Sequence, residues 1–175
     1  KEGDMIFTHF GISGPAVLKI SSYLNKALAD GEVEVVLDFL KDRSKEELAQ
    51  IIRSNSNRFV LNNLKGILPQ NFLKQIFEML NLVEVKASDL KKEDEIKIIE
   101  YIKEMKLTAR ETLTIKAAQV TSGGVKVKEI NASTMESKLI NNLYFAGEVI
   151  DIDAETGGYN LQMAFSTGYL AGSDF

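Results

Sequence analysis

The sequence predicts an α+β fold in which a β-rich, mainly antiparallel domain is interrupted by helices. Alternating and β-branched segments lie near the start of the chain and again in residues 107–138, and such patterns are typical of strands with one buried face. Helical periodicity occupies residues 44–106. The last segment has the pattern of a strand, a loop and a helix. The chain therefore divides into residues 1–43, 44–106, 107–138 and 139–175.

Residues 1–43 begin with a predicted strand over Met5–Phe10, where β-branched and aromatic side chains are dense. We expect the glycines of "GISGP" to end this strand and Ser13 to cap the helix that follows. Pro15 lacks the N–H that a helix start leaves unpaired, and Gly31 ends the apolar periodicity. A second strand is predicted over Val33–Phe39.

Residues 44–106 are predicted to form a compact helical insertion, with helical pattern up to about Met105. Ser44 and Glu47 have the spacing of a capping box, which indicates a helix start. After Pro69, and again after an acidic start near residue 93, apolar residues recur at helical spacing. These residues are Phe72, Ile76, Phe77 and Leu80 in the first stretch, and Ile96, Ile99 and Ile102 in the second.

Residues 107–138 predict a return to strands. Leu113 and Ile115 alternate with polar residues, and so do Val125 and Val127. Between these pairs, Ser122-Gly123-Gly124 has the composition of a hairpin turn. The same glycines also suit a loop that approaches a substrate closely, so both interpretations stay open.

Residues 139–175 begin with "NNLYFAG", a short apolar strand of the kind that is buried on both faces of a sheet. An acidic loop follows, and then a helix entered through Gly157 and Gly158. These glycines leave the backbone N–H groups of the first helical turn free to approach a ligand. Small and apolar residues share one face of the helix: Leu161, Ala164, Phe165, Gly168, Tyr169 and Gly172.

Composition and charge narrow the possible functions. The absence of cysteine and the single histidine exclude disulfides, Cys-ligated zinc, iron–sulfur clusters and multi-His sites, so no metal centre is expected. A net charge of −4 with dispersed lysines gives no basic stripe, so neither nucleic acid nor a membrane surface is an expected partner. No apolar run has membrane-spanning length and no secretory signal is present, so a cytoplasmic location is expected. Because the chain starts with Lys1, we expect it to be a piece of a longer protein.

The start of the final helix favours a group that is, or becomes, negatively charged, because the helix dipole carries partial positive charge there. Asp151, Asp153 and Glu155 would repel a phosphate dianion. Reduced flavin carries negative charge along its N1 and C2 carbonyl edge and suits the position better. Glu148 follows the apolar strand and can accept hydrogen bonds from ribityl hydroxyls. A purely structural turn with solvated carboxylates is the alternative, and a glycine pair alone does not decide between them.

Two side chains are candidates for proton transfer. Imidazole titrates near neutral pH, so His9 is a candidate proton donor, although a structural role at the end of a strand is equally compatible. Tyr159 either donates a hydrogen bond to a substrate or covers the edge of a bound ring.

Four segments in a fixed order carry a family resemblance: "GDMIFTHFGISGP", "VTSGGV", "TMESK" and "LYFAGEVIDIDAETGGYNLQMAFSTGYLAG". Together they resemble the bacterial flavoprotein family of NAD(P)/FAD-dependent oxidoreductases that includes aminoacetone oxidase and BaiN-like proteins. The resemblance extends over nearly all 175 residues. It implies a barrel-like, β-rich domain with a helical insertion, followed by the C-terminal strand, loop and helix of a Rossmann-type FAD domain.

The resemblance also implies FAD as the cofactor and names the residues that contact it. Gly147 and Glu148 match a pair that holds the ribityl chain, and Asp151 lies in the matching acidic stretch. Gly157, Gly158, Tyr159, Asn160 and Leu161 match residues at the pyrimidine edge of the flavin. Met163 stands where an aromatic residue is expected, which affects packing rather than chemistry. No G-x-G-x-x-G with a later acidic residue occurs, so the parts that hold pyrophosphate and adenosine are missing.

The expected function is therefore that of an FAD-dependent oxidoreductase. In its intact form it passes hydride through flavin N5, with NAD(P)H or an amine-type compound as donor and a small molecule as substrate. We expect the chain alone to bind FAD weakly, if at all, and to be inactive. The rival is a non-catalytic interaction module in which the helices of residues 44–106 bind a partner.

Overall fold

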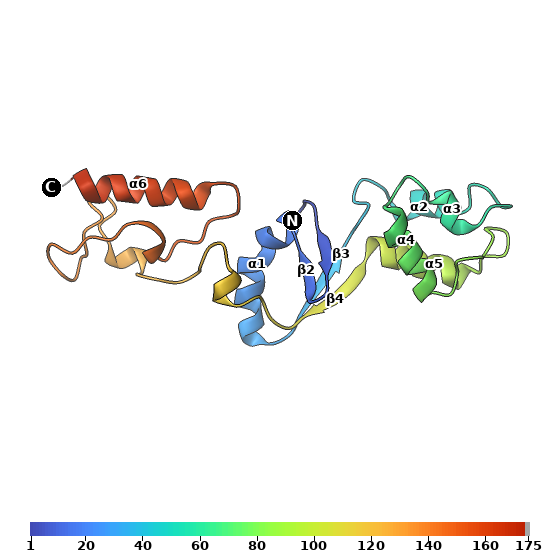
Figure 1. Ribbon diagram of the computed structural model, residues 1–175, viewed down its shortest axis with the longest axis horizontal. Coiled ribbons are helices and arrows are strands. Elements are labelled where there is room, and N and C mark those ends of the chain that lie inside the picture. The colour runs from blue at the N-terminus through green and yellow to red at the C-terminus, as the bar shows by residue number, and fades with distance from the viewer. Residues whose placement is uncertain (174–175) are drawn as a thin grey trace. The chain divides into compact units, whose positions relative to one another are not determined.

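The computed structural model describes residues 1–173 and contains, in this range, six α-helices and four short strands. The predicted α+β class is confirmed. The chain separates into two compact units, the first made of residues 1–33 and 110 onward, and the second of Glu34–Ala109 (Figure 1). Among the described residues, no helix combines the length and the apolar character needed to cross a membrane.

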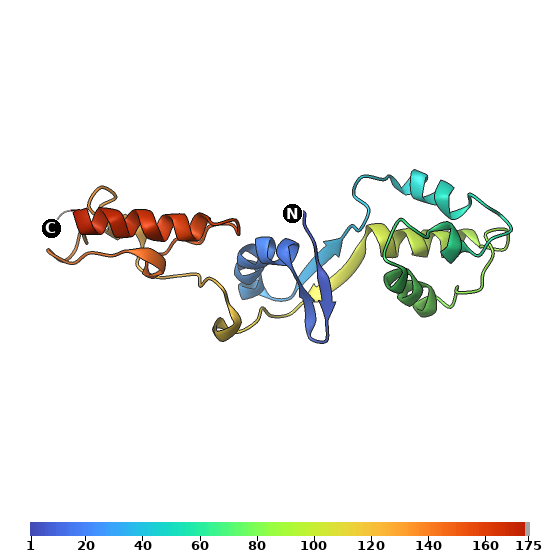
Figure 2. The same cartoon turned by 45° about the horizontal axis from the view of Figure 1, so that its top comes forward.

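The first unit begins with an antiparallel hairpin of β1 (Ile6–Thr8) and β2 (Gly11–Ser13), drawn in dark blue in Figure 2. His9 and Phe10 form the turn between them. The prediction that the glycines of "GISGP" end the strand is wrong, because Gly11 opens the second strand with a φ of 149°. Glycine reaches this region of φ without steric cost.

The first helix, α1 (Pro15–Ala27), begins at a proline, as predicted. The predicted cap by Ser13 is wrong, because Ser13 belongs to the hairpin and Gly14 holds the cap position. A Cβ on Gly14 would lie 2.9 Å from the carbonyl oxygen of Asp4, so the close approach requires glycine. A short 3₁₀ turn follows the helix, and Gly31 ends it.

The second unit contains a two-stranded sheet of β3 (Val33–Leu37, of which residues 34–37 lie in this unit) and β4 (Met105–Ala109). Burial alternates along both strands, as expected for a sheet with one covered face. The prediction of helical pattern up to about Met105 is confirmed. The last helix of this unit ends at Lys103, and the residues from Met105 onward pair with β3.

Four helices enclose the main core of the second unit: α2 (Lys45–Ile52), α3 (Val60–Asn63), α4 (Gln70–Met79) and α5 (Lys92–Lys103). Figures 1 and 2 both show them gathered together. The buried apolar residues are Leu48, Ile52, Val60, Leu64, Leu73, Ile76, Phe77, Leu82, Ala87, Leu90, Ile98, Ile99 and Ile102. The predicted stripe on the last helix is wrong at one position, because Ile96 is 45% exposed and Ile98 is buried in its place.

The capping box predicted at the start of α2 is confirmed. The Ser44 hydroxyl accepts a hydrogen bond from the Glu47 N–H at 3.1 Å, and the Glu47 carboxylate accepts one from the Ser44 N–H at 2.8 Å. We predict that Ser44→Ala lowers the free energy of unfolding by about 1 kcal/mol, because an N–H of the first turn loses its acceptor. Urea unfolding measures this change. Ser54→Ala, outside the cap, is the control, and equal stability of the two variants would contradict the prediction.

Two charged side chains of α5 are buried among these apolar residues. Glu95 is 1% exposed and forms ion pairs with Arg53 and Lys92. Lys103 is 9% exposed, pairs with Asp38 at 2.7 Å and donates to two backbone carbonyls. Each buried charge is therefore compensated, which burial of a charge requires.

The strands predicted between residues 112 and 146 are not formed. Ile115–Ala117 and Val127–Glu129 are 3₁₀ turns with local hydrogen bonds, so the hairpin expected around Ser122–Gly124 is wrong. "NNLYFAG" makes only an isolated bridge, Glu136 to Tyr144, instead of a strand buried on both faces. A strand needs a neighbouring strand for its N–H and C=O groups, and neither sheet of the described residues extends to these segments.

The C-terminal part of the first unit has a small core of its own beneath α6 (Tyr159–Ser173). Its buried residues are Ile130, Met135 and Ile150, with Val125, Phe145, Ile152, Leu170 and Ala171 packed against them. This core places α6 beside the turn at Gly147–Val149.

Candidate functional site

The helix start predicted after the glycine pair is present. α6 begins after Gly157 and Gly158, whose φ angles are 148° and 89°. A Cβ on Gly158 would meet no atom within 4 Å, so the backbone is open at this point. The Gln162 N–H bonds to the Gly158 carbonyl at 2.9 Å and closes the first turn. The N–H groups at residues 159–161 precede this bond and have no acceptor within the helix.

Asn160 joins the acidic loop to α6. Its side-chain NH₂ donates to the Ala154 carbonyl at 2.9 Å, and its Oδ1 accepts from the Ala154 N–H at 2.9 Å. Both ends of the side-chain amide are therefore engaged with the loop backbone. The Asn160 side chain therefore holds the loop in position.

Glu148 is held by Thr121, a residue that the sequence analysis did not single out. Its Oε1 accepts hydrogen bonds from the Thr121 N–H at 2.6 Å and from the Thr121 hydroxyl at 2.8 Å. The backbone bond and then the hydroxyl bond lower the pKa of Glu148 below its usual value. The carboxylate is thus ionised and fixed in one orientation, ready to accept further hydrogen bonds.

The segment after Thr121 runs against the loop that carries Glu148. The Val125 backbone N–H donates to the Val149 carbonyl at 2.9 Å, and the Asp151 backbone N–H donates to the Val125 carbonyl at 2.9 Å. Gly124 has a φ of 140°, and a Cβ there would lie 2.3 Å from the Val149 oxygen. Gly124 of "VTSGGV" therefore permits close backbone contact with the acidic loop.

Gly147 is fixed to α6 in a similar way. Its N–H donates to the Thr167 hydroxyl at 3.0 Å. Thr167 is 8% exposed, and its hydroxyl also donates within α6 to the Met163 carbonyl at 2.8 Å. The sequence "FSTG" gives little sign of this role, because Thr167 lies inside an ordinary helical pattern.

The carboxylates of the acidic loop have different surroundings. Glu155 pairs with Lys1, whose hydrogen bond holds the pKa of Glu155 below its usual value, while Asp151 is exposed. Asp153 differs, because its Oδ2 is buried and has no hydrogen-bond partner among the described residues. A buried oxygen of this kind requires a donor. The described residues contain no cluster of three or more metal-ligating side chains.

The two candidates for proton transfer lie in different elements. Tyr159 is the first residue of α6 and is 64% exposed. Its ring lies close to Gly157, because a Cβ built on Gly157 would be 3.2 Å from the ring. His9 is in the hairpin turn and contacts Phe10 edge-on, with ring centroids 4.8 Å apart. Among the described residues, His9 has no hydrogen-bonding or charged partner, so no positioned base or acid assists it.

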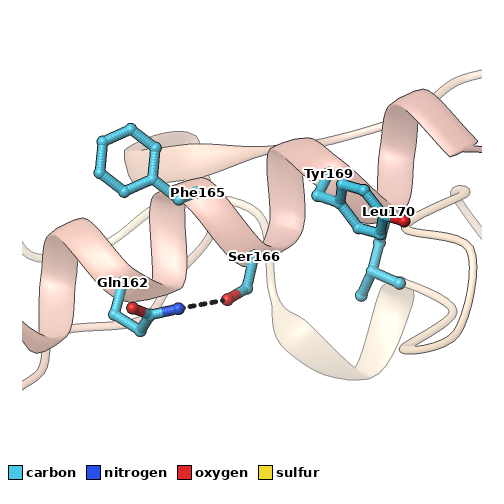
Figure 3. A pocket seen from close by; sticks show the side chains of 5 residues that line it. All are labelled: Gln162, Phe165, Ser166, Tyr169 and Leu170. Atoms are coloured by element: carbon cyan, nitrogen blue, oxygen red, sulfur yellow. Dashed lines mark hydrogen bonds between the residues drawn. The ribbon is translucent and has the colours of Figure 1, made fainter.

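The predicted apolar face of α6 is largely uncovered. Leu161, Phe165 and Tyr169 are 65%, 72% and 76% exposed. Figure 3 shows the hollow beside this face, which has a volume of about 470 Å³ and is lined by Gln162, Phe165, Ser166, Tyr169 and Leu170. Gln162 donates to the Ser166 hydroxyl at 3.1 Å within it. Large exposed apolar side chains on one helix face are typical of a surface that another element covers.

Comparison with known proteins gives two family matches whose ranges overlap. Residues 1–120 match the HI0933-like protein barrel and H2TH domain, and residues 83–174 match the HI0933-like protein Rossmann domain. This order confirms the predicted architecture of a barrel-like domain with helices followed by part of a Rossmann-type domain. The predicted boundaries at residues 43, 106 and 138 stay predictions.

Three curated relatives have similar identity to this chain. The 3-dehydro-bile acid delta(4,6)-reductase of Clostridium scindens is 34% identical over 97% of this chain and 43% of its own length. The ribosomal RNA dihydrouridine synthase of Haemophilus influenzae is 34% identical over 94% of this chain and 40% of its own length. The Escherichia coli protein of the same name is 33% identical over 98% of this chain and 42% of its own length.

The chain thus spans about two fifths of the length of these relatives. The matched ranges cover almost every residue, including the glycine turn and the loop that carries Glu148. The resemblance to a flavoprotein oxidoreductase family is confirmed by these matches, and the chain belongs to the HI0933-like protein family.

Proposed function

We propose that this chain supplies the flavin-facing edge of an FAD-dependent oxidoreductase. The observation that carries the proposal is the buried Asp153 Oδ2, which has no donor among the described residues. It lies close in sequence to the start of α6, whose first N–H groups have no acceptor within the helix. The pyrimidine edge of isoalloxazine alternates carbonyl acceptors with an N–H donor. The N–H groups of α6 would donate to the ring carbonyls, and the Asp153 oxygen would accept from the ring N–H. The open backbone at Gly158 leaves space for a flat ring.

The remaining predicted residues complete this set. The N–H groups of Tyr159, Asn160 and Leu161 would stabilise negative charge at the ring edge through the helix dipole. Glu148 would accept a hydrogen bond from a ribityl hydroxyl, with Gly147 beside it and Asp151 at the solvent side of the loop. When bound, FAD would supply the chemistry of hydride transfer at N5.

The names of the relatives favour a reductase over an amine oxidase. A bile acid delta(4,6)-reductase and a dihydrouridine synthase both add two hydrogens across a carbon–carbon double bond. In each case the double bond is conjugated with a carbonyl group, so one carbon can accept hydride and its neighbour a proton. We propose the same reaction for the complete protein, with NAD(P)H as the electron source and Tyr159, rather than His9, as the better placed proton donor.

The proposal is tested on a polypeptide that contains this chain and extends to the length of its relatives. We predict that it purifies with bound FAD and that Gly158→Ala weakens FAD binding by about tenfold, because an alanine at a φ of 89° is strained and crowds the ligand. Fluorescence titration measures the affinity. Gly172→Ala is the matched control, because Gly172 is open and helical.

A colourless protein that does not take up FAD would contradict the proposal and favour a helical interaction module at residues 44–106. The same polypeptide, reduced with NADH or NADPH, is then offered a conjugated dienone steroid and a uridine-containing RNA. Reduction of neither, with hydrogen peroxide released from an amine donor instead, would overturn the reductase part.

A further inference from the structure

A long stretch of the second unit contains no acidic residue. Residues 48–77 have no aspartate or glutamate, although the chain contains 25 of them, and they include Arg53, Arg58, Lys65 and Lys74. The whole chain has a net charge of −4. The low overall charge therefore conceals a region of local positive charge, and local potential, rather than net charge, attracts an anionic partner at short range.

The stretch folds into a polar hollow of about 410 Å³ lined by Arg58, Asn62, Asn63 and Lys65. Both asparagines belong to α3, with Arg58 just before this helix and Lys65 just after it. The side chains of Arg58, Asn62 and Lys65 carry N–H groups that can donate hydrogen bonds to a ligand, whereas the Asn63 side-chain NH₂ already donates within the protein. The lining thus offers donors and two positive charges, and it is not suited to an apolar ligand.

Hydrogen bonds hold the hollow in shape. The Arg58 carbonyl accepts from the Ala87 N–H at 2.9 Å, which fixes the backbone before α3. The Asn63 side chain donates to the carbonyls of Ile52 at 2.9 Å and Asn55 at 3.1 Å, which ties α3 to the end of α2. The backbone of the hollow therefore needs little ordering when a ligand binds.

The two cations of the hollow are not neutralised. Arg53 pairs with Glu95 and Lys74 with Glu78, whereas Arg58 and Lys65 have no carboxylate partner among the described residues. Both side chains are exposed and line the same hollow. An anion with several acceptor oxygens would bind both, because a guanidinium and an ammonium each donate strongly to phosphate.

We propose that this hollow binds a backbone phosphate of an RNA substrate. The inference rests on the proposed reductase function and selects RNA from its two substrate classes, since two relatives are named ribosomal RNA dihydrouridine synthases. Contacts of this type position a nucleic acid without reading its sequence. The proposal opposes the expectation of no nucleic-acid partner, which considered only the dispersed charge of the whole chain.

The test measures binding of the full chain to a fluorescent rRNA hairpin in a salt series. We expect Arg58→Gln/Lys65→Gln to weaken binding about tenfold at low salt and to reduce the slope of log K against log salt by about one to two. The matched control is Lys74→Gln/Lys97→Gln, which removes the same charge from lysines that already pair with carboxylates. All four side chains are exposed, and circular dichroism verifies the fold.

Three outcomes would overturn the proposal: RNA binding that the two double variants weaken equally, binding to anionic phospholipid vesicles in preference to RNA, or competition by inorganic phosphate as effective as that by RNA. The binding assay needs no flavin. A negative RNA-binding result therefore does not affect the FAD titration, and a negative FAD titration does not affect the RNA-binding result.

Discussion

Gly124→Ala is expected to lower the free energy of unfolding of the first unit by about 2–4 kcal/mol and to separate the acidic loop from residues 121–125. The new Cβ would lie 2.3 Å from the Val149 oxygen and 3.2 Å from the Asp151 nitrogen. Both are backbone atoms, which cannot move aside as a side chain does. Amide hydrogen exchange at Val125 and Asp151 measures the effect, because their N–H groups form the hydrogen bonds at risk.

Gly123→Ala is the matched control for this substitution. Gly123 also has a positive φ, 102°, but a Cβ there would meet no atom within 4 Å. It should show the cost of backbone strain alone, about 1 kcal/mol, with protection at Asp151 retained. If Gly124→Ala exchanges no faster than Gly123→Ala, the close contact between the two segments is not present in solution.

The second large effect is expected for Glu95→Ala, which should lower the free energy of unfolding of the second unit by about 2–3 kcal/mol. The substitution removes a buried carboxylate and leaves the Arg53 and Lys92 cations without their partner. Both cations are partly exposed, so solvent screens part of the loss. Urea unfolding followed by far-UV circular dichroism measures this loss of stability. Glu93→Ala, an exposed position on the same helix, is the control and should change stability little.

The same carboxylate should make stability depend on pH. Burial by itself raises the pKa of Glu95, but hydrogen bonds from Lys92 and Arg53 outweigh it and hold the pKa below the usual 4.5. Because the folded pKa is depressed, the stabilisation is complete above about 4.5 and is lost as pH falls through the folded value. Glu95→Gln should flatten this acid limb. An unchanged slope would mean that Glu95 is not ionised in the folded state.

Local signals predicted part of the fold well. The capping box at Ser44, the helix start at Pro15 and the glycine-led start of α6 are each formed by residues close together in the chain. The strands expected at residues 112–128 and in "NNLYFAG" failed, because their alternation specifies a buried face but not a partner strand. The buried face of α5 was misplaced because Glu95, an acidic residue, occupies a core position there.

The candidate site divides in the same way. The loop and turn that carry Glu148, Gly157, Gly158 and Asn160 were identified from sequence, since they are continuous in the chain. The role of Thr121 was not, because it lies 27 residues from the carboxylate it binds. The engagement of the Asn160 side chain with Ala154 likewise follows from the path of the loop and not from the motif.

By itself, the sequence determined the α+β class, the helix starts and an acidic loop that meets a glycine-led helix, because each depends on side chains within a few residues of one another. Only the tertiary structure decided which groups have partners. It fixes Glu148 through Thr121, and within residues 1–173 it leaves the Asp153 oxygen without a donor and Arg58 and Lys65 without a carboxylate. Satisfaction of a charge or a hydrogen bond depends on every neighbour in space, and contacts between distant segments supply those neighbours.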